Sequence, residues 1–253
     1  MKISVDQVRK ALGPRYGGLS MRTEDTVDST NLRLKEEARS GQIAAPYLLA
    51  ADYQTAGRGR LGRSFISPPD TGLYLSLLYD AQADSGKITI LSAVAVCRAI
   101  EELTGEKPKI KWVNDLFLRG RKISGILAEK IDEGVIIGIG VNILTPPGGF
   151  PESAGVAGAI GYPVDRALLA GLIGRFLLEG LENPNDPRII ASYRERMPLT
   201  GHDIHFEENG QMKNARVTGV ADDGGLMIEG AEGSRVLRCG EISLGSQSFS
   251  GLE

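Results

Sequence analysis

Apolar and polar positions along residues 1–197 follow two periods, one helical and one extended. Apolar residues recur at helical spacing in five segments, residues 5–12, 29–40, 88–103, 166–181 and 188–196. Short apolar runs typical of strands occupy six others, residues 47–53, 73–79, 110–113, 115–118, 123–131 and 135–143. Turn residues at 119–121 and 132–134 predict two hairpins. The first part of the chain is therefore predicted to mix helices and strands.

The pattern changes after Pro198, where short strands follow one another without helices. The predicted strands cover residues 203–207, 215–221, 226–229 and 235–239, with glycine-containing turns between them. Strands of this length, spaced about ten residues apart, indicate a small barrel of SH3-like size. We therefore predict two domains, residues 1–197 and residues 198–253.

Composition and charge narrow the functional classes. The 253 residues are 42% hydrophobic and 24% charged, and no apolar run approaches the ~20 residues of a membrane span. A formal charge of −3 excludes a generally basic protein that coats nucleic acid. Cys97 and Cys239 lack the spacing of metal ligands, so they argue for a reducing compartment and against a disulfide scaffold or zinc site.

Positive charge is concentrated in two short segments. Residues 57–63 carry three arginines and no acid, and residues 107–122 carry six basic residues and a single acid, Asp115. Local charge of this kind in a chain that is negative overall indicates a focused anion site. Glycine is also in excess, at 33 of 253 residues, so many glycines are expected where the backbone approaches a ligand.

The first basic segment, Gly57–Arg63, formally matches the G-x-G-x-x-G fingerprint of dinucleotide-binding proteins. That fingerprint requires a following helix, whereas this segment runs into Ser67-Pro68-Pro69-Asp70 and then a strand. A glycine loop with arginines can instead fold over an anion, using backbone N–H groups and guanidinium groups together. A solvated basic surface loop is the simpler alternative.

The second basic segment contains Lys111-Trp112-Val113-Asn114-Asp115, followed by Arg121-Lys122-Ile123-Ser124-Gly125-Ile126. Asp115 among six cations suits a magnesium ion or a nucleotide hydroxyl. The missing side chain of Gly125 would let a ligand approach the strand beside Lys122. Taken singly, Trp112 also fits a core position, Asn114-Asp115 a turn and Lys122 a strand edge.

Two further motifs add polar groups and bare backbone. Gly138-Ile139-Gly140-Val141-Asn142 strips one face of a strand of its side chains, which makes a flat slot or a barrel corner. Asp28-Ser29-Thr30-Asn31 begins a helix, where an ordinary N-cap is the simplest interpretation. The same hydroxyl and amide groups can recognise a polar small molecule.

Taken together and in this order, these motifs resemble those of the biotin protein ligases, which attach biotin to carboxylases. The match covers about residues 25–143, and Gly240-Glu241-Ile242-Ser243-Leu244 resembles the end of the family's C-terminal domain. The resemblance implies an α+β fold, with a class II synthetase-like mixed sheet, flanking helices and a small C-terminal SH3-like β-barrel.

The resemblance also implies an AMP-forming ligase. Biotin would be activated with the co-substrates ATP and Mg²⁺ to biotinyl-5′-adenylate, and then transferred to a lysine of the biotin carboxyl carrier protein. No tightly bound metal or prosthetic group is expected, and His202 and His205 lack a third metal ligand. We expect a cytoplasmic enzyme without nucleic-acid or membrane partners. Family members include monomers and homodimers, and the sequence does not decide between them.

The family pattern assigns roles to individual residues. Arg60 and Lys122 would be catalytic, stabilising charge on the carboxylate and α-phosphate, and Asp115 would be a Mg²⁺ ligand. The residues expected to bind biotin are Ser29, Thr30, Gln54, Gly57, Arg58, Arg60, Lys122, Gly125, Gly138 and Gly140. Those expected to bind the nucleotide are Arg58, Arg60, Arg63, Lys111, Trp112, Asn114, Asp115 and Asn142.

The sequence departs from the family pattern at three places. Val113 stands where proline is usual, Phe65 stands where tryptophan is frequent, and Gly245 stands where some members place an arginine near the nucleotide. Phe65 is therefore expected to alter the wall beside the biotin tail, and a C-terminal contribution to ATP binding is in doubt.

Three other interpretations compete with a biotin ligase. Lipoate–protein ligases and octanoyltransferases share the fold but lack the glycine–arginine loop and the Lys-Trp-x-Asn-Asp strand. A biotin-responsive regulator would need a helix-turn-helix, whereas the 27 residues before Asp28 hold at most one convincing helix. A non-catalytic biotin-binding module would not need Arg60, Asp115 and Lys122 together.

Overall fold

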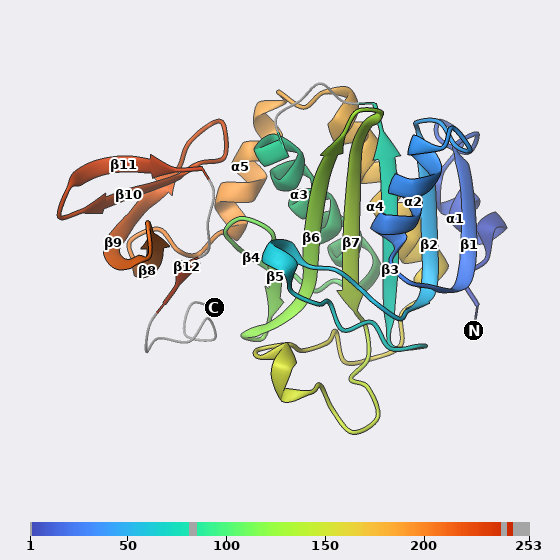
Figure 1. The fold of residues 1–253 in the computed structure, drawn as a ribbon, viewed down its shortest axis with the longest axis horizontal. Helices are drawn as coiled ribbons and strands as arrows, with labels where there is room; N and C mark the ends of the chain where they lie inside the picture. The colour runs from blue at the N-terminus through green and yellow to red at the C-terminus, as the bar shows by residue number, and fades with distance from the viewer. Residues whose placement is uncertain (1, 81–84, 239–241, 245–253) are drawn as a thin grey trace.

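The computed structural model describes residues 2–80, 85–238 and 242–244, and its largest feature is a seven-stranded mixed sheet (Figure 1). The strand order is β1-β2-β3-β7-β6-β5-β4. β1 pairs with β2 in parallel and the remaining neighbours are antiparallel. The strands are β1 (Ser20–Val27), β2 (Tyr47–Gln54), β3 (Gly72–Tyr79), β4 (Lys109–Lys111), β5 (Asp115–Leu118), β6 (Arg121–Ile131) and β7 (Gly134–Asn142).

Helices cover the two faces of this sheet unequally. α3 (Ser85–Thr104) and α4 (Arg166–Glu182) lie against one face, with α1 (Val5–Leu12) packed on α4 and α5 (Pro187–Arg196) packed on α3. Of the helices in the described residues, only α2 (Thr30–Arg39) lies on the opposite face, over β3 and β7. The face under α2 is therefore only partly covered by a helix, and the candidate site lies on the remainder.

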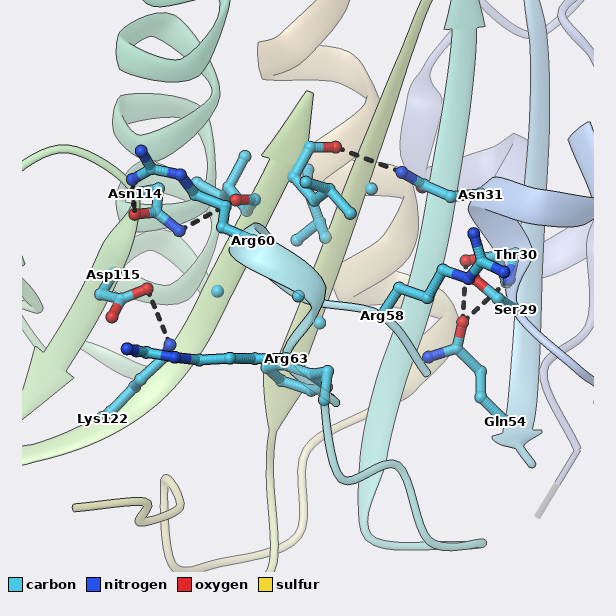
Figure 2. A pocket seen from close by; sticks show the side chains of 18 residues that line it. Ser29, Thr30, Asn31, Gln54, Arg58, Arg60, Arg63, Asn114, Asp115 and Lys122 are labelled. Atoms are coloured by element: carbon cyan, nitrogen blue, oxygen red, sulfur yellow. Dashed lines mark hydrogen bonds and ion pairs between the residues drawn. The ribbon is translucent and has the colours of Figure 1, made fainter. Parts of the chain in front are cut away.

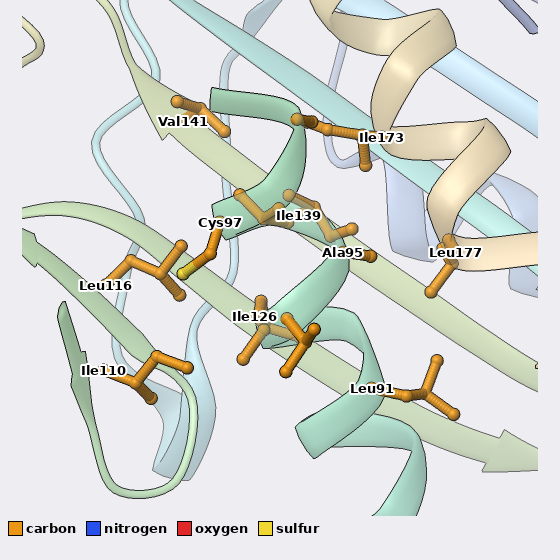
Figure 3. Packing of buried hydrophobic residues seen from close by; sticks show 14 of the residues in the cluster. Leu91, Ala95, Cys97, Ile110, Leu116, Ile126, Ile139, Val141, Ile173 and Leu177 are labelled. Carbon is orange, nitrogen blue, oxygen red and sulfur yellow. The ribbon is translucent and has the colours of Figure 1, made fainter. Parts of the chain in front are cut away.

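The main core lies between the sheet and the α3–α4 layer. Figure 3 shows Leu91 and Ala95 of α3 and Ile173 of α4 packed against Ile126 and Ile139 of the sheet. Cys97 is fully buried in the same layer, and burial raises the pKa of its thiol to about 12. Cys97 is therefore a small apolar core residue, whereas Cys239 lies outside the described residues.

A second sheet of five antiparallel strands follows α5. Its order is β11-β10-β9-β8-β12, and its strands are β8 (Asp203–Glu208), β9 (Gln211–Val220), β10 (Leu226–Gly230), β11 (Gly233–Leu237) and β12 (Ile242–Ser243). The turn between β9 and β10 contacts the residue that follows β4 of the large sheet: the Trp112 indole N–H donates to the Gly224 carbonyl at 3.0 Å. The Arg194 guanidinium of α5 donates to the Val220 carbonyl at 2.6 and 2.8 Å.

The predicted α+β class with a small C-terminal β unit is confirmed, with differences in detail. All five predicted helices are present, and both hairpins around β6 have the expected turns. β1 was not predicted because its residues are mostly polar and half-exposed. β4 ends at Lys111, before the predicted end, because residues 112–114 form a turn that contains a cis peptide bond between Trp112 and Val113. In the described part of the chain no helix is long and apolar enough to cross a bilayer.

We expect Gly171→Ala to lower the free energy of unfolding by about 1–3 kcal/mol, because overpacking forces neighbouring backbones apart. A Cβ at position 171 of α4 would lie 2.4 Å from the Cβ of Ala11 and 2.6 Å from the Val8 carbonyl oxygen in α1. Urea unfolding followed by circular dichroism measures the change.

Gly180→Ala in the same helix is the matched control. Its Cβ would meet nothing closer than 3.5 Å, so the substitution should stabilise the helix by about 0.5–1 kcal/mol. Equal destabilisation by both substitutions would contradict close α1–α4 packing as the cause.

Candidate functional site

A pocket opens on the α2 face of the large sheet, between the start of α2 and the strands β5 and β6 (Figure 2). Its floor is formed by β6 and β7, and the loop between β2 and β3 covers it. The lining residues are Ser29, Thr30, Asn31, Gln54, Arg58, Gly59, Arg60, Arg63, Phe65, Asn114, Asp115, Lys122, Gly125, Ile126, Leu127, Gly138, Ile139 and Gly140. Segments that are far apart in the sequence thus meet at one place.

One end of the pocket is polar and uncharged. Ser29 is the N-cap residue of α2 but makes no side-chain cap hydrogen bond, and Thr30 begins the helix. The Thr30 backbone N–H donates to Gln54 Oε1 at 2.9 Å, and the Thr30 hydroxyl lies 3.1 Å from the same oxygen. All three side chains are buried. Buried polar groups held in fixed directions are suited to recognise a neutral polar ring.

The opposite end of the pocket is cationic. Arg60 donates to Asn114 Oδ1 at 2.8 Å, and Lys122 Nζ lies 2.8 Å from Asp115 Oδ1. Arg63 extends toward Lys122, whereas Arg58 extends toward Ser29 and Thr30 (Figure 2). Three arginines and a lysine with one aspartate leave this pocket with a net positive charge, so it favours an anionic ligand.

The glycine-rich segment between β2 and β3 forms an irregular hairpin over the pocket. The Phe65 N–H donates to the Gly57 carbonyl at 2.9 Å, and the Gly59 N–H donates to the Arg63 carbonyl at 2.7 Å. A single 3-10 turn over Arg60–Gly62 forms its tip. The next regular element is β3, so the structure lacks the helix that a dinucleotide fingerprint requires.

The three glycines expected to form a slot lie in the floor of the pocket, but side chains already lie against them. A Cβ at Gly140 would lie 2.4 Å from Cε1 of Phe65, and one at Gly125 would lie 3.3 Å from Cε2 of the same ring. A Cβ at Gly138 would lie 2.1 Å from Oδ1 of Asn31. The slot therefore exists, with Phe65 over one part of it and Asn31 over the other.

Most of the site residues expected from the sequence line this pocket. The four expected residues that do not line it in the described structure are Gly57, Lys111, Trp112 and Asn142. Gly57 is where the loop closes on itself, since a Cβ there would lie 2.4 Å from the Phe65 carbonyl. Trp112 is buried in the core, as the simpler interpretation held. The Asn142 amide donates to the Gly158 carbonyl at 3.0 Å, and thereby holds the segment after β7.

Two polar residues near the floor were not among the site residues expected from the sequence, although Asn31 belongs to the Asp28-Ser29-Thr30-Asn31 motif considered there. Asn31 lines the pocket, and Ser76 of β3 lies beneath it with its hydroxyl 2.7 Å from that of Thr30. A signal for Ser76 was present, because it is the one serine in the otherwise apolar strand Gly72–Tyr79. Phe65 was expected to form a wall but not to cover the glycine floor.

Comparisons with known proteins agree with this geometry. Residues 24–142 match the biotin/lipoate A/B protein ligase family. The chain is 30% identical to the bifunctional ligase/repressor BirA of Bacillus subtilis, over 96% of this chain and 80% of that protein. It is also 30% identical to the biotin–[acetyl-CoA-carboxylase] ligase of Mycobacterium tuberculosis, over 85% of each protein.

A solved structure supports the same assignment. The biotin protein ligase of Aquifex aeolicus, solved in complex with biotin and ATP, superimposes with a TM-score of 0.75 at 28% identity, over 88% of this chain and 97% of that one. The family match and the identity to these relatives over most of their length lead to one conclusion, which the expected motifs in the pocket support. The chain belongs to the biotin protein ligases of the biotin/lipoate A/B protein ligase family.

Proposed function

We propose that this protein activates biotin with ATP to biotinyl-5′-adenylate and transfers biotin to a lysine of the biotin carboxyl carrier protein of a carboxylase. One observation carries the proposal: a single pocket joins a buried neutral end at Thr30 and Gln54 to a cationic end at Arg60 and Lys122. Biotin has the same two ends, a polar uncharged ureido ring and a carboxylate.

The chemistry requires positive charge where the two reactants meet. A carboxylate oxygen of biotin attacks the α-phosphorus of ATP, and pyrophosphate leaves. The carrier lysine's amine then attacks the carbonyl carbon of the anhydride, and AMP leaves. Because a carboxylate and a triphosphate repel each other, fixed cations lower the barrier to the first step.

We assign that role to Arg60 and Lys122. Arg60 is half-buried and held by Asn114, and Lys122 is held by Asp115, so both cations are positioned before a ligand arrives. Positions fixed in advance need little reorganisation during the reaction. Arg58 and Arg63 are exposed on the loop, where they can follow it as it closes over the adenylate.

The donor set near Lys122 fits Mg²⁺ held mainly by phosphate. Asp115 supplies a carboxylate and Asn114 an amide oxygen, both hard donors that Mg²⁺ prefers. Among the described residues no group of three or more His, Cys, Asp or Glu side chains is placed to hold a metal ion. Asp115 would therefore supplement the phosphate oxygens of ATP in holding Mg²⁺, which would supply positive charge beside the phosphates.

Several further properties belong to the same proposal. We assign residues 1–197 to the catalytic domain and residues 198–253 to a C-terminal SH3-like domain. The enzyme would act in the cytoplasm. Whether it works as a monomer or a homodimer can be measured by sedimentation.

Activity with two acids tests the function directly. Incubation with ATP, the carrier protein and either labelled biotin or labelled lipoate should label the carrier with biotin. Exclusive transfer of lipoate would reject the proposal and favour a lipoate–protein ligase.

Lys122→Ala should slow adenylate formation by roughly 10²–10³-fold, because it removes a charge from the reacting oxygens. Pyrophosphate release at saturating biotin and ATP measures the rate. Lys130→Ala is the matched control, since Lys130 is exposed on the same strand, β6, and does not line the pocket. Equal rates for the two variants would remove Lys122 from the mechanism.

Gly140→Ala should raise the KM for biotin about 10–200-fold, which is the usual effect of one added or missing methylene group in a hydrophobic pocket. The added Cβ would occupy the floor, 2.4 Å from the present position of the Phe65 ring. The KM for ATP serves as the internal control and should stay within about twofold of the wild-type value. An unchanged KM for biotin would place biotin away from β7.

A further inference from the structure

We propose that Ser76 is a positioning residue that fixes the Thr30 hydroxyl as a hydrogen-bond acceptor, so that the pocket selects a ligand N–H group at this point. The inference rests on the proposed function and specifies how the biotin end of the pocket discriminates between ligands. It follows from tracing each hydrogen through two hydrogen-bond chains that meet at Thr30.

The first chain begins at Glu129 of β6. The Asn31 amide nitrogen donates to Glu129 Oε2 at 2.8 Å and lies 3.3 Å from the Leu127 carbonyl, and both of these oxygens accept. Lys35 lies 3.5 Å from the other Glu129 oxygen. These contacts fix the orientation of the Asn31 amide, and its oxygen faces Ser76.

The packing around Asn31 leaves little freedom for another arrangement. Ser76 pairs directly with Gly138 across β3 and β7, and Asn31 lies over that glycine. A Cβ at position 138 would lie 2.1 Å from Asn31 Oδ1. Gly138 therefore makes room for the Asn31 amide as well as forming part of the floor.

Ser76 transmits this orientation to Thr30. Its hydroxyl is fully buried and lies 2.6 Å from Asn31 Oδ1 and 2.7 Å from Thr30 Oγ1. Because Asn31 Oδ1 carries no hydrogen, the single hydrogen of Ser76 must point to it. The Thr30 hydroxyl must then donate to Ser76 Oγ, or to Gln54 Oε1 at 3.1 Å.

The second chain fixes Gln54 independently. Ser67 donates to the Phe65 carbonyl at 2.9 Å, so Ser67 Oγ accepts from the Gln54 amide nitrogen at 2.9 Å. The amide oxygen of Gln54 therefore faces Thr30, where it accepts from the backbone N–H. Both oxygens near the Thr30 hydroxyl thus act as acceptors toward it, and only its lone pairs remain for a ligand.

An acceptor at this place discriminates by chemistry and not by size. The ureido ring of biotin presents N–H donors, which the Thr30 lone pairs can bind. The dithiolane ring of lipoate has no such donor. In an analogue with a ring oxygen in place of the N–H, a lone pair of that oxygen would face a lone pair of the Thr30 hydroxyl. A site that leaves a buried polar group unpaired with the wrong ligand discriminates strongly.

The test compares biotin with its two cyclic carbamate analogues, in each of which an oxygen replaces one ureido N–H. Adenylate formation is measured for both kinds of ligand, and discrimination is the ratio of their kcat/KM values. The wild-type enzyme should prefer biotin over at least one carbamate by roughly 10²-fold or more. Ser76→Ala removes the nearer of the two acceptors and leaves the Thr30 hydroxyl with only the longer contact to Gln54 Oε1. The hydroxyl then turns toward the ligand more easily, so that preference should fall by about tenfold.

Three further variants make the result specific. Thr30→Val, which removes the hydroxyl, should lower the preference at least as far. Ser76→Cys keeps most of the volume and is a weaker donor and acceptor, so it should act in the same direction if Ser76→Ala folds poorly. Ser92→Ala is the matched control, because Ser92 is equally buried but donates to the Ile88 carbonyl within α3.

The outcomes separate the two levels of the proposal. Loss of preference in Ser76→Ala but not in Ser92→Ala supports the inference. An unchanged preference, or an equal loss of kcat/KM with biotin and carbamate, overturns it and leaves the proposed function standing. Absence of biotinyl-adenylate with the wild-type enzyme would overturn the proposed function itself.

Discussion

The site depends on the alternation of side chains along β7. Val135, Ile137, Ile139 and Val141 point into the main core, while the opposite face carries Ile136, Gly138, Gly140 and Asn142 in succession. Ile136 packs in the cluster under α2, and the next two positions have no side chain. One strand therefore anchors the sheet with one face and leaves a bare floor for the pocket with the other.

Different elements around that floor supply the neutral end and the cationic end of the pocket. The start of α2 and the end of β2 bring neutral groups that are satisfied by one another, which limits the cost of burying them. The cations come from a loop and a hairpin edge, where side chains stay partly hydrated. Burying Arg60 and Lys122 without partners would be costly, and their contacts with Asn114 and Asp115 offset that cost until a ligand arrives.

Periodicity and turn chemistry were enough to predict the helices and the central strands, because each buries a continuous apolar face. They did not find β1, whose residues are half-exposed at the sheet edge and whose pairing with β2 is a long-range event. Motif order brought the correct segments together, but side-chain direction could not be read from it. Trp112 belongs to a binding motif in sequence, yet its ring is in the core, in the same cluster as Ile110 two residues earlier.

The position of Trp112 connects the two sheets at the cationic end of the pocket. Its indole N–H donates to the Gly224 carbonyl in the turn between β9 and β10, and the Tyr193 hydroxyl of α5 donates to the Val113 carbonyl at 3.2 Å. The next residue, Asn114, donates to the Ile126 carbonyl at 3.0 Å and accepts from Arg60. Three consecutive residues are thus held by the second sheet, by α5 and by the pocket floor. The turn that carries Asn114 is therefore held from outside the pocket, and the C-terminal sheet is part of the support of the site.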